Sequence, residues 1–333
     1  MDARYGDLTA WIGSTLGHIE EIRPASSDAS FRRYFRVVKD GHSLIVMDAP
    51  PDREPVGAYV RIARRLLEIG LNVPEIIAGD EDRGFLLLSD LGETPYLQRL
   101  VSGTSTTGDV DRLYGDALAA LITLQTGGLT DPGFLPPYDS DLLRREMDLF
   151  PQWYLAKHLG RAPNAGEQRL LDQAFEALVS SALEQPQVWV HRDYHSRNLM
   201  QTAHNNPGIL DFQDAVLGPI TYDLVSLLKD AYVAWPRKQV NEWVTGFCQL
   251  EIDSGLVEQR CEDRFQRWFD LMGVQRHLKV AGIFARLNYR DGKSWYLSDI
   301  PRVLGYVEEV LPLYPELRPL AEIMTRYRLL AIA

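Results

Sequence analysis

The chain lacks the features that mark disulfide-stapled, membrane-spanning or secreted proteins. Its 333 residues include only two cysteines, Cys248 and Cys261, too few for a disulfide framework or a cysteine-rich metal site. No apolar run reaches the length of about 18 residues that a membrane-spanning helix needs. The opening M-D-A-R-Y-G-D contains acidic residues and leads into no apolar core of signal-peptide length. These absences favour a cytoplasmic protein without a membrane partner.

Positive charge is also in short supply. The formal net charge is −11 at pH 7, which argues against a nucleic-acid partner because no broad basic surface can neutralise phosphates. A small polyanionic ligand could still bind through a local basic pocket or a metal ion. The hydrophobic content of 45% and the charged content of 24% are ordinary for a globular protein, and nothing in them calls for a protein partner.

The first part of the chain alternates short strands with one helix. The hydrophobic spacing predicts a helix over residues 5–17, strands over 31–38 and 43–47, a helix over 55–69, and strands over 75–78 and 84–88. The run Ser89-Asp90-Leu91-Gly92 then breaks the pattern. We therefore predict a nucleotide-binding N-terminal lobe over residues 1–92 that ends in a hinge at 89–92.

The remaining chain is mostly helical. Amphipathic helices are predicted over 109–125 and 166–183, a strand-loop-strand insert over about 188–214, and four or five further helices after it. The length of 333 residues allows two lobes, each with its own core. The prediction is an α+β, protein-kinase-like fold of two lobes, with a small mixed α/β N-terminal lobe and a helical C-terminal lobe over 93–333.

The strongest chemical signal is the run W-V-H-R-D-Y-H-S-R-N-L-M followed by G-I-L-D-F-Q-D. It contains H-R-D-x-x-x-x-N, the spacing that kinase-type phosphoryl transfer uses. Asp193 in the predicted catalytic loop 191–198 is the expected base for the acceptor hydroxyl. Asn198, and Asp211 in the metal-binding segment 211–213, are the expected Mg²⁺ ligands, because this ion prefers hard oxygen donors.

Three neighbouring residues are expected to support this loop without reacting. We predict structural roles for His191 and Arg192, the histidine tying the loop to backbone carbonyls. Asp223 begins a helix after a Gly218-Pro219 turn and is expected to brace the loop through backbone amides, although a plain helix cap is the alternative.

The nucleotide side departs from the usual kinase pattern twice. The stretch that should cover the phosphates, S-S-D-A-S-F-R-R-Y-F, has no glycine, so Ser27, Ser30 and Phe31 are its candidate contacts. The other candidate nucleotide contacts are Ser89, Asp90 and Leu91. The strand ending Val46-Met47-Asp48 lacks the expected lysine, and the nearest lysine is Lys39. Arg33 or Arg36 could supply the charge, with Glu54 or Glu68 as its partner.

Several stretches together carry a family resemblance that covers about residues 20 to 310. H-R-D-Y-H-S-R-N-L-M with L-D-F-Q-D-A-V-L-G-P resembles the aminoglycoside-phosphotransferase-type small-molecule kinases. V-M-D-A-P-P, R-G-F-L-L-L-S-D-L-G and L-M-G-V-Q-R-H-L-K-V-A-G narrow the match to the bacterial anomeric kinases of N-acetylmuramate and N-acetylglucosamine. The resemblance implies ATP and Mg²⁺ as cofactors and phosphoryl transfer to the C1 hydroxyl of an amino sugar during cell-wall recycling.

The sugar contacts are less sharply marked. Candidates are His195, Arg197, Asp214, Gln275, Arg276 and His277, and Arg276 or Arg197 could meet the lactyl carboxylate of N-acetylmuramate. Two alternatives stay open: a kinase of another small alcohol such as choline, homoserine, thiamine or an aminoglycoside, and a nucleotide-binding pseudokinase. The second draws only on the missing glycine loop and lysine, since Asp193, Asn198 and Asp211 are all present.

Overall fold

The computed structural model describes residues 3–26 and 31–330, and the chain forms two compact units. The N-terminal unit comprises Met1–Tyr96 and Arg197–Asp214, and the C-terminal unit comprises Leu97–Ser196 and Ala215–Ala333. The sequence analysis placed residues 197–214 in the C-terminal lobe and the boundary at 92. This segment instead belongs to the N-terminal unit, because the backbone amides of Gln201 and Ile209 donate to the carbonyls of Thr94 (2.8 Å) and Asn72 (2.7 Å).

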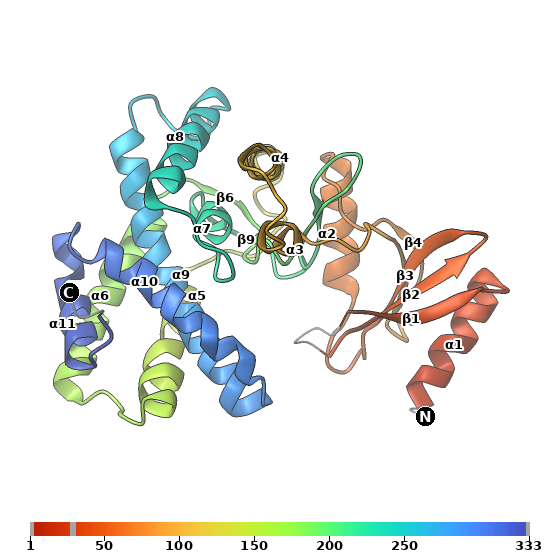
Figure 1. Ribbon diagram of the computed structural model, residues 1–333, viewed down its shortest axis with the longest axis horizontal. Coiled ribbons are helices and arrows are strands. Elements are labelled where there is room, and N and C mark those ends of the chain that lie inside the picture. The colour runs from red at the N-terminus through yellow and green to blue at the C-terminus, as the bar shows by residue number, and fades with distance from the viewer. Residues whose placement is uncertain (1–2, 27–30, 331–333) are drawn as a thin grey trace. The chain divides into compact units, whose positions relative to one another are not determined.

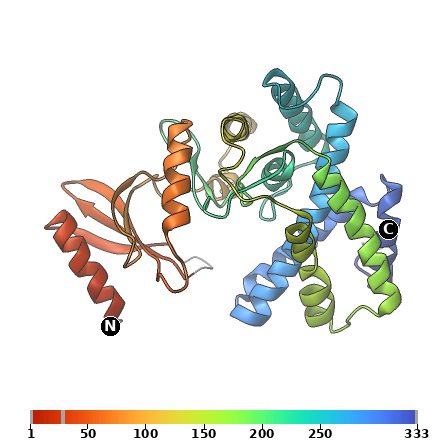
Figure 2. The same cartoon turned by 180° about the vertical axis from the view of Figure 1, so that it is seen from behind.

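The N-terminal unit is built on a five-stranded antiparallel sheet (Figure 1). Its strands, in the spatial order β1-β2-β3-β5-β4, are β1 (Glu21–Ser26), β2 (Arg33–Lys39), β3 (His42–Asp48), β5 (Phe85–Ser89) and β4 (Ile76–Asp80). Helix α1 (Ala3–Leu16) and helix α2 (Gly57–Glu68) lie on opposite sides of this sheet (Figures 1 and 2).

Alternation along the strands explains how the sheet meets α1. Val46, Phe85 and Leu87 are fully buried and pack with Leu8 and Trp11 of α1. Successive side chains of a strand point to opposite faces, so Met47 and Leu86 turn away from α1 and are buried on the other side. Hydrophobic residues on both faces therefore hold the sheet between two helices.

Most elements predicted for this unit are confirmed within a few residues. Strand β1 was missed because Pro24 interrupts its pattern. Proline cannot donate to a strand ladder and is tolerated on edge strands, and β1 is the edge of this sheet. A smaller ladder, β7 (Leu199–Met200) with β8 (Gly208–Ile209), belongs to the same unit.

The C-terminal unit is organised around the long helix α9 (Glu262–Asp291). Its core includes buried residues of η1 (Phe150–His158, a π-helix), α6 (Ala165–Leu183), α10 (Ile300–Val310) and α11 (Arg318–Arg326). Figure 2 shows α6 beside α11. At Gly282 of α9 a Cβ would lie 2.4 Å from the carbonyl carbon of Leu149, so only glycine lets the two backbones approach this closely.

The remaining helices agree with a mostly helical C-terminal lobe, although those over residues 96–101 and 140–147 were not predicted. They are α3 (Tyr96–Val101), α4 (Thr107–Gly128), α5 (Ser140–Met147), α7 (Tyr222–Leu228), α8 (Arg237–Asp253), η2 (Ser294–Asp299) and η3 (Pro315–Leu317). Helices α4 and α6 begin at capping boxes made by Thr106 with Asp109 and by Asn164 with Glu167. Within residues 3–26 and 31–330, no helix is both long enough and apolar enough to cross a membrane.

Candidate active site

The loop 191–198 leaves a short antiparallel ladder of the C-terminal unit, β6 (Gln187–Val190) with β9 (Val216–Pro219). Its first turn is fixed by Asp223 at the start of α7. The carboxylate of Asp223 accepts hydrogen bonds from the backbone amides of His191 (2.6 Å) and Arg192 (2.9 Å). Arg192 has a φ of 76°, a left-handed conformation that non-glycine residues adopt only when their surroundings impose it. The predicted bracing role of Asp223 is confirmed.

A second buried carboxylate holds the other end of the loop. Asp230 accepts from the backbone amide of Ser196 (3.0 Å) and from that of Tyr232 (2.9 Å). The sequence analysis missed Asp230, because an aspartate just after a helix looks like an ordinary helix end. Asp223 therefore holds the start of the loop that contains Asp193, and Asp230 holds the loop at Ser196.

Two side chains of the loop also act structurally. The backbone amide of Asp193 donates to Nδ1 of His191 (3.2 Å), so this histidine contacts the backbone of its own loop. The guanidinium of Arg192 donates to the buried carboxylate of Glu146. Lys279 lies 3.1 Å from the same carboxylate and donates to the hydroxyl of Tyr222 (2.9 Å).

These charges set the ionisation of Asp193. Burial opposes its charged form, but the nearby charges, chiefly Lys279 and also Arg276, outweigh burial and lower the pKa of Asp193 to about 2. Burial raises the pKa of Asp223 to about 7, although its two amide hydrogen bonds favour the charged form. Asp193 is therefore ionised across the physiological pH range.

Helix α9 and the loop hold polar groups with unused hydrogen-bonding capacity. Within residues 3–26 and 31–330, neither Nε nor Nη1 of Arg276 has a hydrogen-bond partner, although the residue is only 3% exposed. Nδ1 of His195 and Oε1 of Gln275 are also buried without partners there. A buried polar group without a hydrogen-bond partner costs free energy, so a polar ligand that supplies partners to these groups would gain binding affinity.

The other predicted acceptor contacts differ in their surroundings. Both ring nitrogens of His277 lie against backbone carbonyls, those of Gly273 (2.5 Å) and Lys229 (2.9 Å), and burial lowers its pKa to about 3. This gives His277 a packing role within the helical core. Arg197 and Asp214 are exposed and belong to the N-terminal unit, whereas His195 and residues 275–277 belong to the C-terminal unit.

Asn198 and Asp211 meet at one end of the β7–β8 ladder in the N-terminal unit. The amide of Leu210 donates to the carbonyl of Asn198 (2.9 Å), which extends the ladder by one residue pair. Asp211 is the residue that follows Leu210. Asp211 has a φ of 64°, and Nε2 of Gln213 donates to its Oδ1 (2.7 Å). Phe212 is fully buried and packs against Tyr59 of α2, with 4.8 Å between the ring centroids and the rings tilted by 34°.

The donor set of this ladder suits Mg²⁺. It offers one amide oxygen and one carboxylate, and residues 3–26 and 31–330 contain no cluster of three or more His, Cys, Asp or Glu side chains placed to hold a metal. Mg²⁺ is commonly held by only one or two protein carboxylates, with water and phosphate oxygens completing its shell. Asn198 and Asp211 therefore fit a magnesium ion that arrives with a nucleotide.

The segment 89–92 is held by its own side chains. Asp90 accepts from Arg36 at 2.5 and 2.9 Å, from Ser43, and from the amide of Gly92 (2.9 Å). Burial opposes ionisation of Asp90, but these hydrogen bonds outweigh it and lower its pKa. The hydroxyl of Ser89 accepts from the amide of Glu75 (2.9 Å). Since these side chains are occupied, any nucleotide contact here falls to the backbone.

Two of the three predicted contacts in the phosphate-covering stretch, Ser27 and Ser30, lie outside the described residues. The third, Phe31, is 56% exposed, and the guanidinium of Arg53 lies 4.6 Å from its ring centroid. Its exposed ring is consistent with a position at the surface of the N-terminal unit.

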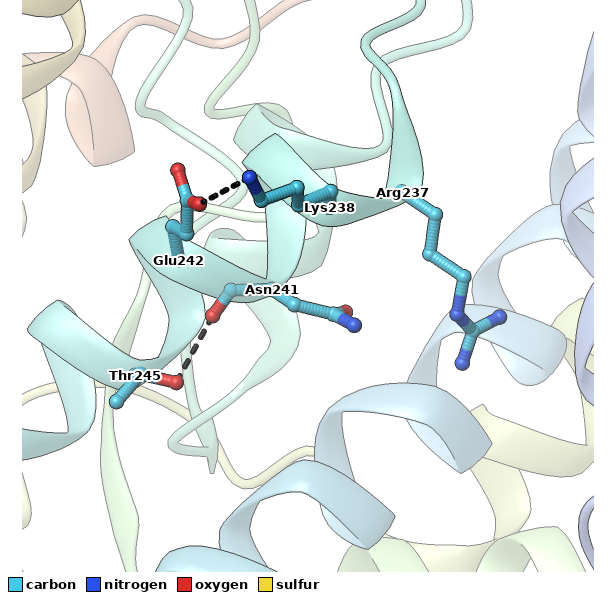
Figure 3. Close-up of a pocket in the computed structure, with 5 residues that line it drawn as sticks. All are labelled: Arg237, Lys238, Asn241, Glu242 and Thr245. Carbon is cyan, nitrogen blue, oxygen red and sulfur yellow. Dashed lines mark hydrogen bonds and ion pairs between the residues drawn. The ribbon is translucent and has the colours of Figure 1, made fainter.

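A surface hollow of about 630 Å³ on α8 is lined by none of the candidate site residues named above (Figure 3). It is lined by Arg237, Lys238, Asn241, Glu242 and Thr245. Its polar groups are already engaged: Lys238 lies 3.8 Å from Glu242, and Thr245 donates to the carbonyl of Asn241 (2.9 Å). The catalytic motif contributes nothing to it, and we assign it no role in the chemistry.

Comparison with known proteins defines the class. Residues 21–262 match the phosphotransferase enzyme family, and the chain belongs to that family. It is 46% identical to the N-acetylmuramate/N-acetylglucosamine kinase of Pseudomonas aeruginosa over 97% of this chain and 96% of that protein. The kinase of the same name from Neisseria meningitidis is 46% identical over 89% of this chain and 87% of its own length.

Solved structures show the same fold at low sequence identity. An ADP-bound aminoglycoside phosphotransferase, APH(2'')-Ib, superposes with a TM-score of 0.58 at 15% identity, covering 92% of this chain and 98% of that chain. The choline kinase of Streptococcus pneumoniae gives 0.61 at 10% identity, covering 92% of this chain and all of the other, 100%. The predicted protein-kinase-like fold is confirmed, and the chain is an ATP-dependent phosphotransferase.

Proposed function

We propose that this protein transfers the γ-phosphoryl group of ATP to the anomeric C1 hydroxyl of N-acetylmuramate and N-acetylglucosamine. The product is the sugar 1-phosphate, formed during peptidoglycan recycling in the cytoplasm, where ATP is available. The observation that carries the proposal is the near-full-length identity of 44–46% with relatives of that name. The proposal requires no nucleic acid, membrane or protein partner.

Asp193 is the proposed base. Its carboxylate accepts a hydrogen bond from the C1 hydroxyl and orients the oxygen towards the γ-phosphorus. The new C1–O–P bond forms as the bond between the γ-phosphorus and the β–γ bridging oxygen breaks, ADP leaves, and the hydroxyl proton passes to Asp193. A pKa of about 2 makes Asp193 a weak base. A weak base is sufficient because the transition state is loose and an anomeric hydroxyl is more acidic than an ordinary alcohol.

Asn198 and Asp211 are the proposed ligands of Mg²⁺. When bound, the ion would neutralise charge on the phosphate oxygens and help to align them. Gln213, which donates to Asp211 at 2.7 Å, and the packing of Phe212 against Tyr59 would keep the carboxylate in place. For the adenine ring, the backbone of Ser89–Leu91 supplies the proposed contacts.

Arg276 is the proposed contact for the lactyl carboxylate of N-acetylmuramate. Its buried Nε and Nη1, which have no hydrogen-bond partner among the described residues, can each donate to a carboxylate oxygen, and its charge acts on Asp193. His195 and Gln275, which also have unused polar atoms, are proposed contacts for sugar hydroxyls or the acetamido group. Arg197 and Asp214 remain predicted sugar contacts. His277 is not proposed as a sugar contact, because both of its ring nitrogens lie against backbone carbonyls.

The second candidate, a kinase of a cationic alcohol such as choline, is disfavoured by the same residues. Arg276 and Lys279 surround Asp193 with positive charge, which would repel a cationic acceptor. The similarity to a choline kinase structure is a likeness of fold at 10% identity.

A coupled ADP-release assay with Mg²⁺ and ATP tests the proposal. The acceptors would be N-acetylmuramate, N-acetylglucosamine, glucose, choline and kanamycin. We expect turnover of the two N-acetyl sugars and little with the others. Turnover confined to choline or kanamycin would overturn the substrate assignment and keep the phosphotransferase class. No turnover with any acceptor, despite measurable ATP binding, would favour a pseudokinase.

A further inference from the structure

The N-terminal unit has no lysine where kinases hold the non-transferred phosphates of ATP. In protein kinases that lysine is on the third strand and is paired with a glutamate of the following helix. Here β3 ends in Asp48, which is fully buried. Lys39, the only lysine of this unit in the sequence, pairs with His42 at the turn end of the β2–β3 hairpin, whereas Asp48 pairs with Arg33 at the other end. These ends are about 20 Å apart at the usual rise per residue.

Both arginines proposed from the sequence are committed elsewhere. Arg33 holds Asp48, with its Nε 2.9 Å from Oδ2, and Nε of Arg4 lies 2.7 Å from the other oxygen of that carboxylate. Arg36 holds Asp90 of the hinge and lies 2.6 Å from Glu93. These two cations therefore stabilise the sheet and the hinge.

Arg32, the residue just before β2, has a different environment. Its Nη2 lies 2.7 Å from Oε2 of Glu54, and its Nη1 lies 4.0 Å from Oδ1 of Asp211. The side chain of Arg32 is 10% exposed, that of Glu54 is 19% exposed and that of Asp211 is 33% exposed. A largely buried arginine is thus held beside the proposed metal ligand, and its position in the sequence lies within the predicted phosphate-covering stretch 26–35.

Glu54 is fixed by its own backbone. Its amide donates to the carbonyl of Pro50 (2.7 Å) in the turn that precedes α2. Glu68, the alternative partner considered from the sequence, instead pairs with Arg65 at 3.0 Å on the surface of α2. The choice between the two glutamates therefore falls on Glu54, which lies before the helix and not on it.

We propose that Arg32, held in place by Glu54, binds the α- and β-phosphates of ATP in place of the missing lysine. A guanidinium presents a planar fork of donors, so one edge can stay on Glu54 while the other meets phosphate oxygens. Arg32 and Glu54 nearly cancel each other in charge, so the pair is stable before nucleotide arrives. This inference rests on ATP-dependent transfer and does not depend on which sugar accepts the phosphate.

ADP binding measured by calorimetry, with Mg²⁺ and without any sugar, tests this inference. We expect Arg32→Met to weaken ADP binding at least about tenfold, since hydrogen bonds to charged groups contribute most. Arg32→Lys should recover part of the affinity, because it restores the charge without the fork. Glu54→Gln should weaken binding by a smaller factor. The control is Arg64→Met, which removes an exposed arginine of α2 in the same unit.

Steady-state kinetics then separate this inference from the substrate assignment. We expect Arg32→Met to raise KM for ATP and to leave KM for the sugar nearly unchanged. Melting temperatures identify any variant that fails to fold; should Arg32→Met fail, Arg32→Gln replaces it in the same comparison. A folded variant that binds ADP as tightly as wild type, or that changes only the sugar KM, would overturn the proposal. Failure of every sugar as a substrate, with ADP affinity still dependent on Arg32, would overturn only the sugar assignment.

Discussion

The carboxylate of Asp223 lies 2.6 Å from the backbone nitrogen of His191, two residues before Asp193. The same carboxylate receives the amide of Arg192 at 2.9 Å, and Arg192 is held at a φ of 76°. A buried side chain at the start of α7 thereby sets the backbone of the catalytic loop. Asp223 acts through this backbone, so we regard it as a positioning residue.

Replacing Asp223 should therefore lower kcat more than it changes substrate binding. At pH 8, above the Asp223 pKa of about 7, Asp223→Asn keeps the shape of the side chain but removes the charge that accepts hydrogen bonds from two amides. Each such hydrogen bond contributes about 1–3 kcal/mol, so we expect kcat to fall by roughly 10- to 100-fold. KM for ATP should change less than about threefold. Asp141→Asn, on the exposed surface of α5, is the control. A rise in KM for ATP at constant kcat would contradict a positioning role.

Asp193→Asn should lower kcat by roughly 10²- to 10⁴-fold, the usual contribution of a general base, with ADP affinity retained. The pH profile gives a second check. Because the pKa of Asp193 is about 2, the base is ionised throughout pH 5–8, and its titration should cause no rise in kcat over that window. Activity should be lost through this group only as the pH falls towards 2. A full-activity Asn variant would remove Asp193 from the mechanism.

Arg276 should distinguish the two proposed sugars, because only N-acetylmuramate carries a lactyl carboxylate. Arg276→Met should raise KM for N-acetylmuramate by about 10- to 100-fold, the loss expected for a charge-assisted pair. KM for N-acetylglucosamine serves as the internal control and should stay within about threefold. The kinetics of Arg276→Met are measured on both sugars. An equal rise in KM for both would indicate that Arg276 supports the loop or the phosphates instead of binding the lactyl carboxylate.

Glu251 of α8 should make stability depend on pH. It is fully buried, neither carboxylate oxygen has a partner within residues 3–26 and 31–330, and burial raises its pKa from 4.5 to about 8. The folded protein therefore holds a proton that the unfolded chain releases above about pH 4.5. The contribution to stability is present in full below that pH and is lost as the pH rises through 8, with a size of a few kcal/mol, about 3–5 at most.

The variant Glu251→Gln should remove this dependence. Denaturant unfolding at pH 5 and pH 8.5 measures it, with Glu242→Gln on the exposed side of the same helix as the control. We expect the wild-type protein and the control to lose stability between the two pH values and Glu251→Gln to lose less. An equal loss in all three proteins would show that Glu251 is ionised or paired in the folded state.

Local sequence patterns predicted much of the fold. The continuous apolar run over residues 43–47 predicted β3. The helical spacing of Tyr59, Val60 and Ala63 predicted α2, because burial of one helix face imposes that period. The catalytic loop and the role of Asp223 were also predicted, since their spacing lies within one short stretch. Strand β1 was missed because Pro24 belongs to an edge strand that needs fewer donors.

The remaining features depend on contacts between distant parts of the chain. Asp230 and Lys279 reach the catalytic loop from other elements, and no local pattern marks them. Arg32, Arg33 and Arg36 look alike in sequence, and only their carboxylate partners, Glu54, Asp48 and Asp90, distinguish them. Whether 197–214 joins the first or the second unit depends likewise on backbone hydrogen bonds to Asn72 and Thr94.

The position of the transferred phosphate on the sugar is the best test of whether this protein is an anomeric kinase that uses Asp193 as its base. The product made from N-acetylmuramate, ATP and Mg²⁺ would be followed by phosphorus NMR with coupling to sugar protons, using Asp193→Asn as the control reaction. We expect one new phosphorus signal coupled to the anomeric proton, and no such signal in the control. A phosphorus signal coupled to the C6 protons, or the same product at the same rate with Asp193→Asn, would contradict it.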